Sequence, residues 1–190
     1  MSFLDKIASS IMPAASDQER AEARQKAQEL SQSQDWLEMV LDHHRLIEGA
    51  FDRALNATAS ENRIEAAREL AMMLTGHANA EESVIYPAVV EYSGKAHAAM
   101  AFEEQAAAKI NMALLENIDP MSDDWREKLE HIQAAVAQHV YQEESSWFPD
   151  VMQNAPGDKQ RLLTDRYAEE FERYCGNLGS KQPSRLAPIA

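Results

Sequence analysis

Several residue types that define other classes of protein are scarce in this sequence. A single cysteine, Cys175, excludes an internal disulfide and a cysteine-based zinc site, and we interpret it as a structural or incidental residue. Only 6 glycines occur among 190 residues, whereas Ala, Leu, Met, Gln, Glu and Arg are abundant, which favours helix nearly throughout. No run of about 18 apolar residues is present, so we expect no membrane-spanning helix.

Positive charge is also scarce. The chain has 18 Lys and Arg against 32 Asp and Glu, which gives a formal net charge of -14. An acidic surface repels nucleic acid and anionic lipid, so neither is expected as a partner. Residues 1–16 lack the basic start and long apolar core of a signal peptide, and we expect a cytoplasmic protein.

Apolar residues at helical spacing predict four long helices over about 35–55, 63–93, 95–116 and 124–155. A polar helix is expected before them, over about 17–33, and an amphipathic one after them, over about 158–174. Pro87 is expected to kink the second long helix, and the third is expected to bury a face that includes Phe102, Gln105 and Met112. Three helix caps are predicted from the pairs Ser16 and Glu19, Asp35 and Glu38, and Asp124 and Glu127.

The short connections between the long helices favour one all-α domain with an up-down-up-down four-helix bundle. We expect an N-terminal arm and peripheral helix in residues 1–34, the bundle in 35–156, a C-terminal helix in 157–176 and a flexible tail in 177–190. Within the arm, residues 1–11 are expected to form a short amphipathic turn.

A short motif occurs twice, 62 residues apart. Histidine, two glutamates, serine, an aromatic residue and proline occupy identical offsets in residues 77–87 and 139–149. Residues four apart share one face of a helix, so His77 and Glu81 aim at one point, as do His139 and Glu143. One such pair alone is typical of a surface ion pair. Two copies on apolar stripes indicate instead that facing helices enclose a metal.

The imidazoles and carboxylates of the motif would be buried, because they fall on the apolar stripes of their helices. An unpaired buried carboxylate is costly, and two facing carboxylates repel each other unless they bind protons or a cation. A divalent metal removes both penalties. Nitrogen and oxygen donors without thiolate suit iron, manganese or zinc, and carboxylates from two helices can bridge a metal pair. Iron is our first choice, and a bundle without metal is the alternative.

The first and third long helices carry the remaining candidate ligands. His44 shares the apolar stripe of Val40 and Ile47. Its neighbour His43 corresponds better to Gln105 under the 62-residue offset. Helix phase decides where a side chain points, so we favour His44 as the ligand and place the other histidine behind it.

With these motifs the sequence resembles the hemerythrin-like, or HHE cation-binding, family from about Asp35 to Pro156. The resemblance rests on three segments, His43-His44-Arg45-Leu46-Ile47-Glu48, His77-xxx-Glu81-Glu82 and His139-xxx-Glu143-Glu144. Members of the family hold a non-haem di-iron centre inside a four-helix bundle. The resemblance therefore implies three terminal ligands and two bridging ones, namely His44, His77 and His139 with Glu81 and Glu143.

The third helix departs from the family, because Glu104 and Gln105 stand where a Glu-His pair is expected. One imidazole is therefore missing, and an amide oxygen is a weak ligand. The site then binds only one iron firmly, recruits Glu104 after a small helix rotation, or holds two metals with water in place of the imidazole. An open coordination position favours reaction with oxygen, peroxide or nitric oxide and argues against reversible oxygen carriage.

Other residues near the motifs are interpreted as lying outside the ligand set. Glu82 and Glu144 stand about 100° round the helix from the ligand carboxylates, so they are solvated or act behind the ligands. His97 and His131 are too far along their helices to reach the same metal. Packing over the cavity is the expected role of the neighbouring aromatic residues, Tyr86, Trp147 and Phe148. A redox role of Tyr86 is the less favoured alternative.

Three functions are compatible with this pattern. The leading hypothesis is a non-haem iron protein, with one or two metal ions, that binds or senses oxygen, reactive oxygen or nitrogen species, or iron. Its expected partner is then a small diatomic ligand or peroxide. The second is a di-iron peroxidase or oxidase that uses the position left open by Gln105. The third is a metal-free structural or signalling bundle that engages a protein partner or a second copy, so enzymatic activity stays an open question.

Overall fold

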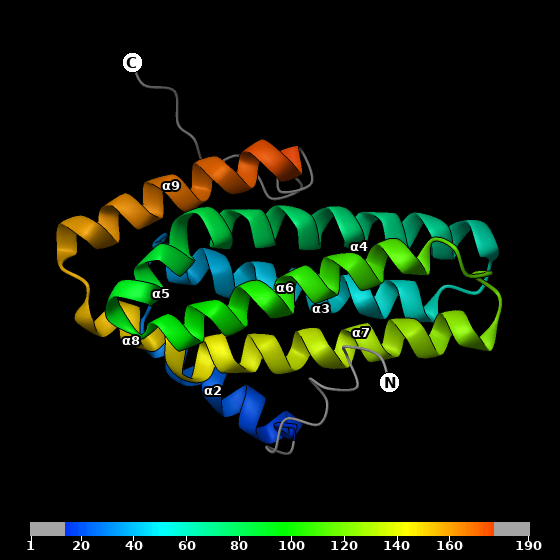
Figure 1. Cartoon of the computed structure of the whole chain (residues 1–190), viewed down its shortest axis with the longest axis horizontal. Coiled ribbons are helices and arrows are strands. Elements are labelled where there is room, and N and C mark those ends of the chain that lie inside the picture. The colour runs from blue at the N-terminus through cyan, green and yellow to red at the C-terminus, as the bar shows by residue number, and fades with distance from the viewer. Residues whose placement is uncertain (1–13, 177–190) are drawn as a thin grey trace.

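The computed structural model describes residues 14–176, which form helices without any β-strand (Figure 1). The bundle consists of α3 (Trp36–Asn56), α4 (Ser60–Ala80) continued by η1 (Glu81–Ile85) and α5 (Tyr86–Tyr92), α6 (Lys95–Leu115), and α7 (Asp123–Gln142) continued by η2 (Glu143–Trp147) and α8 (Phe148–Asn154). Successive long helices run in opposite directions (Figure 1). The predicted all-α, up-down-up-down architecture is therefore confirmed.

Two further helices flank the bundle. The N-terminal helix α2 (Asp17–Leu30) packs on η2, α3 and α8, and the C-terminal helix α9 (Gly157–Cys175) packs on α4, α3 and η1. The contact between α4 and α9 requires glycine at one point, because a Cβ atom at Gly76 would overlap Cys175 Sγ. The predicted arm in residues 1–11 and the predicted tail in 177–190 lie outside the described residues.

Apolar side chains fill two regions of the bundle, separated by buried polar residues. The first region includes Trp36, Leu41, Phe148 and Tyr167, and the second includes Ile47, Phe51, Leu70 and Leu129. Burying each large apolar side chain contributes roughly 1.5–3 kcal/mol. His44 lies on α3 between Leu41 of the first region and Ile47 of the second. The polar residues are thus held between two close-packed layers.

Two of the three predicted caps are present. Ser16 and Glu19 form a capping box at α2, and Asp35 accepts a hydrogen bond from the backbone N–H of Glu38 at α3. The cap predicted at Asp124 is wrong, because α7 begins at Asp123 and Ser122 caps it. Asp124 instead lies in the first turn, where its negative charge interacts favourably with the positive end of the helix dipole.

The inner face predicted for the third bundle helix is wrong at Phe102. Gln105 and Met112 are buried as expected, but the Phe102 side chain is 41% exposed. Its ring packs edge to face on Tyr86, with ring centroids 5.1 Å apart. Phe102 therefore covers the outside of Tyr86 instead of filling the bundle interior.

Both copies of the repeated motif contain one turn of π-helix. The N–H of Tyr86 donates to the carbonyl of Glu81, and the N–H of Phe148 donates to the carbonyl of Glu143, so each turn spans five residues. A proline follows each turn, and proline clashes with the carbonyl four residues before it in a regular α-helix. A kink is predicted at Pro87, and what the structure shows before this proline is a widened turn. Such turns occur frequently at functional sites.

No helix within residues 14–176 combines the length and the apolar character that crossing a membrane requires.

Candidate metal centre

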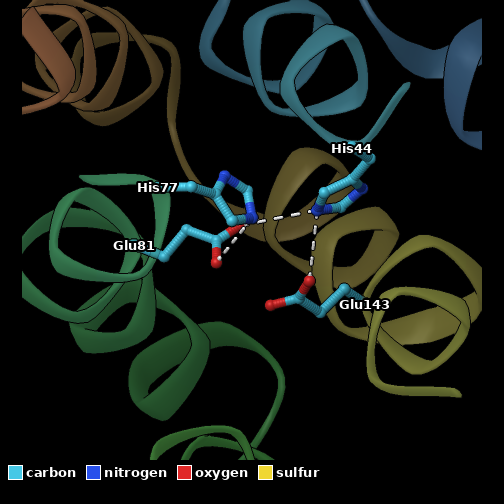
Figure 2. A group of neighbouring side chains, drawn as sticks. All are labelled: His44, His77, Glu81 and Glu143. Carbon is cyan, nitrogen blue, oxygen red and sulfur yellow. Dashed lines mark ion pairs between the residues drawn. The ribbon is translucent and has the colours of Figure 1, made fainter. Parts of the chain in front are cut away.

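Four buried side chains from α3, α4, η1 and η2 converge inside the bundle (Figure 2). They are His44, His77, Glu81 and Glu143, and one potential ligand atom of each lies within 4.8 Å of the others. The exposed fraction of each residue is 4% or less. Their separation of at most 4.8 Å matches donor atoms arranged around a single metal ion, whose ligand bonds are about 2.0–2.2 Å long.

The distances within this group leave several buried atoms without protein partners. His44 Nε2 lies 3.3 Å from Glu143 Oε2 and 3.7 Å from Glu81 Oε1. None of these three atoms has a hydrogen-bond partner among the described residues. Leaving one buried polar group unpaired costs about 1–3 kcal/mol. One cation bound between the three atoms would satisfy all of them, so the residues present fit a metal ion.

Each of the three predicted ligand histidines has a hydrogen-bond partner at Nδ1. His44 Nδ1 lies 2.8 Å from Glu144 Oε1, and His139 Nδ1 lies 2.8 Å from Glu104 Oε2. A carboxylate only accepts, so Nδ1 carries a proton, and in the neutral form of each imidazole the Nε2 lone pair faces the centre. The third, His77 Nδ1, lies 3.2 Å from the Tyr167 hydroxyl. Metal-binding histidines in proteins are oriented by this kind of partner.

His139 lies beside the four-residue group and not within it. Its Nε2 is 3.3 Å from Glu143 Oε1, the carboxylate oxygen that faces away from His44. The two oxygens of Glu143 therefore face different imidazoles, and its role as a bridging ligand stays a prediction that this arrangement supports. Gln105 Nε2 donates to Glu81 Oε2 at 2.5 Å, and Gln105 Oε1 has no partner among residues 14–176.

The electrostatics of the centre favour a cation. Burial and the neighbouring Glu143 carboxylate raise the pKa of Glu81 to about 7. Burial disfavours the charged form of His139, yet Glu143 and Glu104 raise its pKa to about 10. Three carboxylates likewise raise the pKa of His44 above its usual range, against the effect of burial. Without a metal, the site therefore attracts protons to balance its negative charge.

A family model described as the hemerythrin HHE cation binding domain matches residues 35–151. The chain belongs to the hemerythrin HHE family. A curated relative from Nostoc sp. (strain PCC 7120 / SAG 25.82 / UTEX 2576), named DNA nickase, is 30% identical over 99 residues, which are 52% of this chain and 27% of the relative. The chain thus aligns with about a quarter of that protein. No solved structure matches.

In this hemerythrin HHE protein, the adjacent histidines of α3 lie in different surroundings. His44 is fully buried and faces the carboxylates, as the apolar stripe predicts. His43 points toward α9, where its Nδ1 lies 2.8 Å from the Tyr167 hydroxyl and its ring stacks on Phe171. Burial lowers the pKa of His43 to about 3, so its imidazole is neutral. Ligation by His44 stays a prediction that this geometry supports.

The glutamates that follow Glu81 and Glu143 in the sequence lie behind or outside the HHE site. Glu144 is 1% exposed and joins His44 to Arg24 of α2, whose Nε lies 2.9 Å from Glu144 Oε1. Glu82 pairs with Lys109 at the surface of the bundle. The sequence pattern predicts that each of these glutamates is either solvated or acts behind the ligands, and it does not choose between the two roles. Only the packing of α2 against one copy of the motif distinguishes them.

The structure places the other two histidines away from the centre. The imidazole of His97 contacts the Ser93 hydroxyl and stacks on Trp147, and His131 is exposed. Glu104 reaches His139 Nδ1 and not the converging oxygens, so it orients an imidazole.

Three residues near the HHE centre are not identified by sequence reasoning in these roles. Tyr86 is predicted as packing, yet its hydroxyl donates to Glu143 Oε1 at 2.9 Å. Burial and the charges of Glu143 and Glu81 raise the pKa of Tyr86 well above its usual range, so the free hydroxyl is a donor. Arg24 and Tyr167 act from the flanking helices. The role of Tyr86 was not predicted because the sequence analysis assumed a regular α-helix. The π-turn in each motif changes which residues share a face of the helix.

Proposed function

We propose that this chain is a non-haem iron protein of the hemerythrin HHE family that binds or senses oxygen, reactive oxygen or nitrogen species, or iron. The observation that carries the proposal is the group of three buried, partnerless atoms, His44 Nε2, Glu81 Oε1 and Glu143 Oε2. Their burial is costly without a cation, and their spacing suits one. His77 Nε2 completes the set of donors around the same point.

Iron is the metal we propose, with zinc and manganese as the alternatives to be tested. Two imidazoles and two carboxylates are borderline and hard donors without sulfur, which suits Fe(II) and Fe(III). When bound, iron would supply redox chemistry and a coordination position for a small ligand. The protein residues would hold the donor atoms, and the two apolar layers would restrict access of water.

The first experiment measures metal content. Protein produced with iron supply should contain iron, and anomalous scattering at the iron and zinc edges should place the metal between His44, His77, Glu81 and Glu143. The Glu81→Gln and Glu143→Gln variants should lose most of it. Glu82→Gln is the matched control, because Glu82 neighbours Glu81 and pairs with Lys109 at the surface. Wild-type protein without any transition metal would refute the proposal.

Ligand binding is measured on the iron-loaded protein. Addition of oxygen, peroxide or nitric oxide to the ferrous form should change its visible spectrum. A spectrum that responds to none of them would exclude oxygen and nitrogen species as ligands and leave iron itself as the sensed species.

A peroxidase or oxidase is the second candidate. The observation that favours it is Gln105, a weak amide donor at the position where the family has an imidazole. Peroxide turnover that is abolished in the two glutamate variants would establish this activity, and inert iron-loaded protein would exclude it.

We do not carry over the activity named for the Nostoc relative. The aligned segment is 27% of that protein, and the net charge of this chain is -14, which opposes binding of DNA. Supercoiled plasmid incubated with the iron-loaded protein is therefore expected to stay intact.

A further inference from the structure

The two halves of the site are unequal, although the motif repeats. The 62-residue offset relates His77 to His139, Glu81 to Glu143 and Tyr86 to Phe148. The first half faces two imidazoles, from His44 and His77. Under the same offset Gln105 corresponds to the histidine pair of α3, so the second half has only one imidazole, from His139, and the phenol of Tyr86 lies beside it.

The atoms around Tyr86 have the spacing of donors on one metal ion. Tyr86 Oη lies 2.9 Å from Glu143 Oε1 and 3.2 Å from His139 Nε2, and these two atoms are 3.3 Å apart. Adjacent donors on an octahedral ion with bonds of about 2.1 Å are separated by roughly 3 Å. The three atoms therefore form a triangle that matches one face of such an octahedron. Glu81 Oε2 lies 3.4 Å from Tyr86 Oη, but it is closer to His77 Nε2, at 3.2 Å, and belongs with the first group of donors.

The π-turn explains why Tyr86 reaches this position. In a regular α-helix, residues five apart stand about 140° apart around the axis, so Tyr86 would point away from Glu81. The wider turn of η1 brings the two side chains onto one face. Phe148 occupies the equivalent position after η2, and its ring stacks on His44 with centroids 6.4 Å apart. An aromatic ring is thus common to both halves, but the hydroxyl occurs only where an imidazole is missing.

We propose that Tyr86 is a ligand of a second metal ion, which it binds as phenolate together with His139 and Glu143. This inference rests on the proposed function, because it requires iron in the bundle. On binding, the O–H bond of the phenol breaks and the Oη–metal bond forms. The proton passes to solvent, and no electron is transferred. Ferric iron suits this donor set because it prefers anionic oxygen ligands.

The test is spectroscopic and uses the full chain loaded with iron and oxidised in air. A phenolate bound to ferric iron absorbs visible light by charge transfer, and resonance Raman spectra show the ring modes of the bound tyrosine. The wild type should show both signals. Tyr86→Phe should lose them and bind about one iron fewer per chain, while it keeps the iron between His44, His77, Glu81 and Glu143.

Tyr167→Phe tests the other buried tyrosine beside the site. Tyr167 is also fully buried and its hydroxyl lies 3.2 Å from His77 Nδ1, so a bound tyrosine other than Tyr86 would be found there. Its variant should keep the ring modes of bound tyrosine because Tyr86 is unchanged, even though loss of the His77 Nδ1 partner weakens binding of the first iron. Growth with ring-deuterated tyrosine shifts the Raman modes of the wild type, so the presence of a bound phenolate is decided even when a variant folds poorly.

The outcomes separate the two proposals. Absence of iron from the wild type refutes the proposed function. Iron-loaded wild type without phenolate modes, or with a band that persists in Tyr86→Phe, overturns the role of Tyr86 and leaves iron binding established. A band lost in Tyr167→Phe and kept in Tyr86→Phe would overturn it as well.

Discussion

At the scale of single residues, the direction of each imidazole is decided by what lies behind it. His44 and His43 are neighbours in sequence, but a helix turns about 100° per residue, so they face opposite surroundings. A carboxylate holds the Nδ1 proton of His44, whereas His43 contacts a tyrosine hydroxyl and an aromatic ring of α9. The same chemical group is thus presented as a metal donor at one position and as a neutral packing residue at the next.

A substitution at Gln105 tests the missing imidazole. Gln105 is buried, and its amide donates to Glu81 Oε2. Gln105→His should tighten binding of the second metal by roughly tenfold or more, because imidazole is a stronger donor than an amide. Metal titration followed by calorimetry measures the two affinities separately. Unchanged stoichiometry and affinity would show that position 105 does not face the second metal.

At the scale of elements, the flanking helices support the centre from outside the matched domain. The family match covers residues 35–151, so both α2 and α9 lie outside it. Helix α2 supplies Arg24, which pairs with the buried Glu144, and α9 supplies Tyr167 beside His77. Two of the three Nδ1 partners thus depend on a flanking helix.

Removal of Arg24 tests the contribution of α2. Arg24→Met keeps most of the apolar contact but leaves the buried Glu144 carboxylate without its cation, so His44 loses a well-placed acceptor. Metal affinity should fall by about 10- to 100-fold, as found for other residues that orient metal ligands. The reduction potential of bound iron should shift too.

Arg45→Met is the matched control for that experiment. Arg45 also joins α3 to α2, through Gln28, but its ion pair with Asp42 lies at the surface. It should leave affinity and potential unchanged. Equal losses in both variants would mean that α2 acts only by stabilising the fold.

At the scale of the whole molecule, the buried charges link folding to pH. The pKa of Glu81 is about 7 in the folded protein against an ordinary 4.5. Between these values the folded protein holds a proton that the unfolded chain has released. The resulting stability is complete below about pH 4.5 and is lost as the pH rises through 7. Metal binding replaces this proton, so the metal-loaded protein should show the opposite trend.

Urea unfolding of chelator-treated protein at pH 5 and pH 8 measures this effect. The free energy of unfolding of the wild type, relative to Glu81→Gln, should fall by on the order of 2 kcal/mol between the two values. The amide of the variant does not titrate, so titrating groups that do not interact with Glu81 cancel in the comparison. A constant difference between wild type and variant would show that Glu81 carries no extra proton in the metal-free protein.

The all-α bundle and the convergence of the four side chains could be predicted from the sequence. Helical spacing identifies the buried face of a helix. In both copies the histidine and the glutamate are four residues apart, so they share one face of the helix independently of the tertiary structure. The phase of His44 in its apolar stripe belongs to the same kind of local information. The cap at Ser122 was not predicted, because α7 begins earlier than the sequence pattern indicates. The exposure of Phe102 was not predicted, because it depends on the contact of this ring with Tyr86 of another helix.

The repeated motif by itself determined where imidazoles and carboxylates would meet, since helix geometry alone relates residues four apart. Only the tertiary structure decided that Tyr86 joins them, because the widened turn depends on how proline is accommodated after it. The tertiary structure also decided that Arg24 and Tyr167 support two of the histidines. Arg24 is 120 residues from Glu144, and Tyr167 is 90 residues from His77. Contacts over such distances in the sequence follow from helix packing, and no periodic pattern in the chain predicts them.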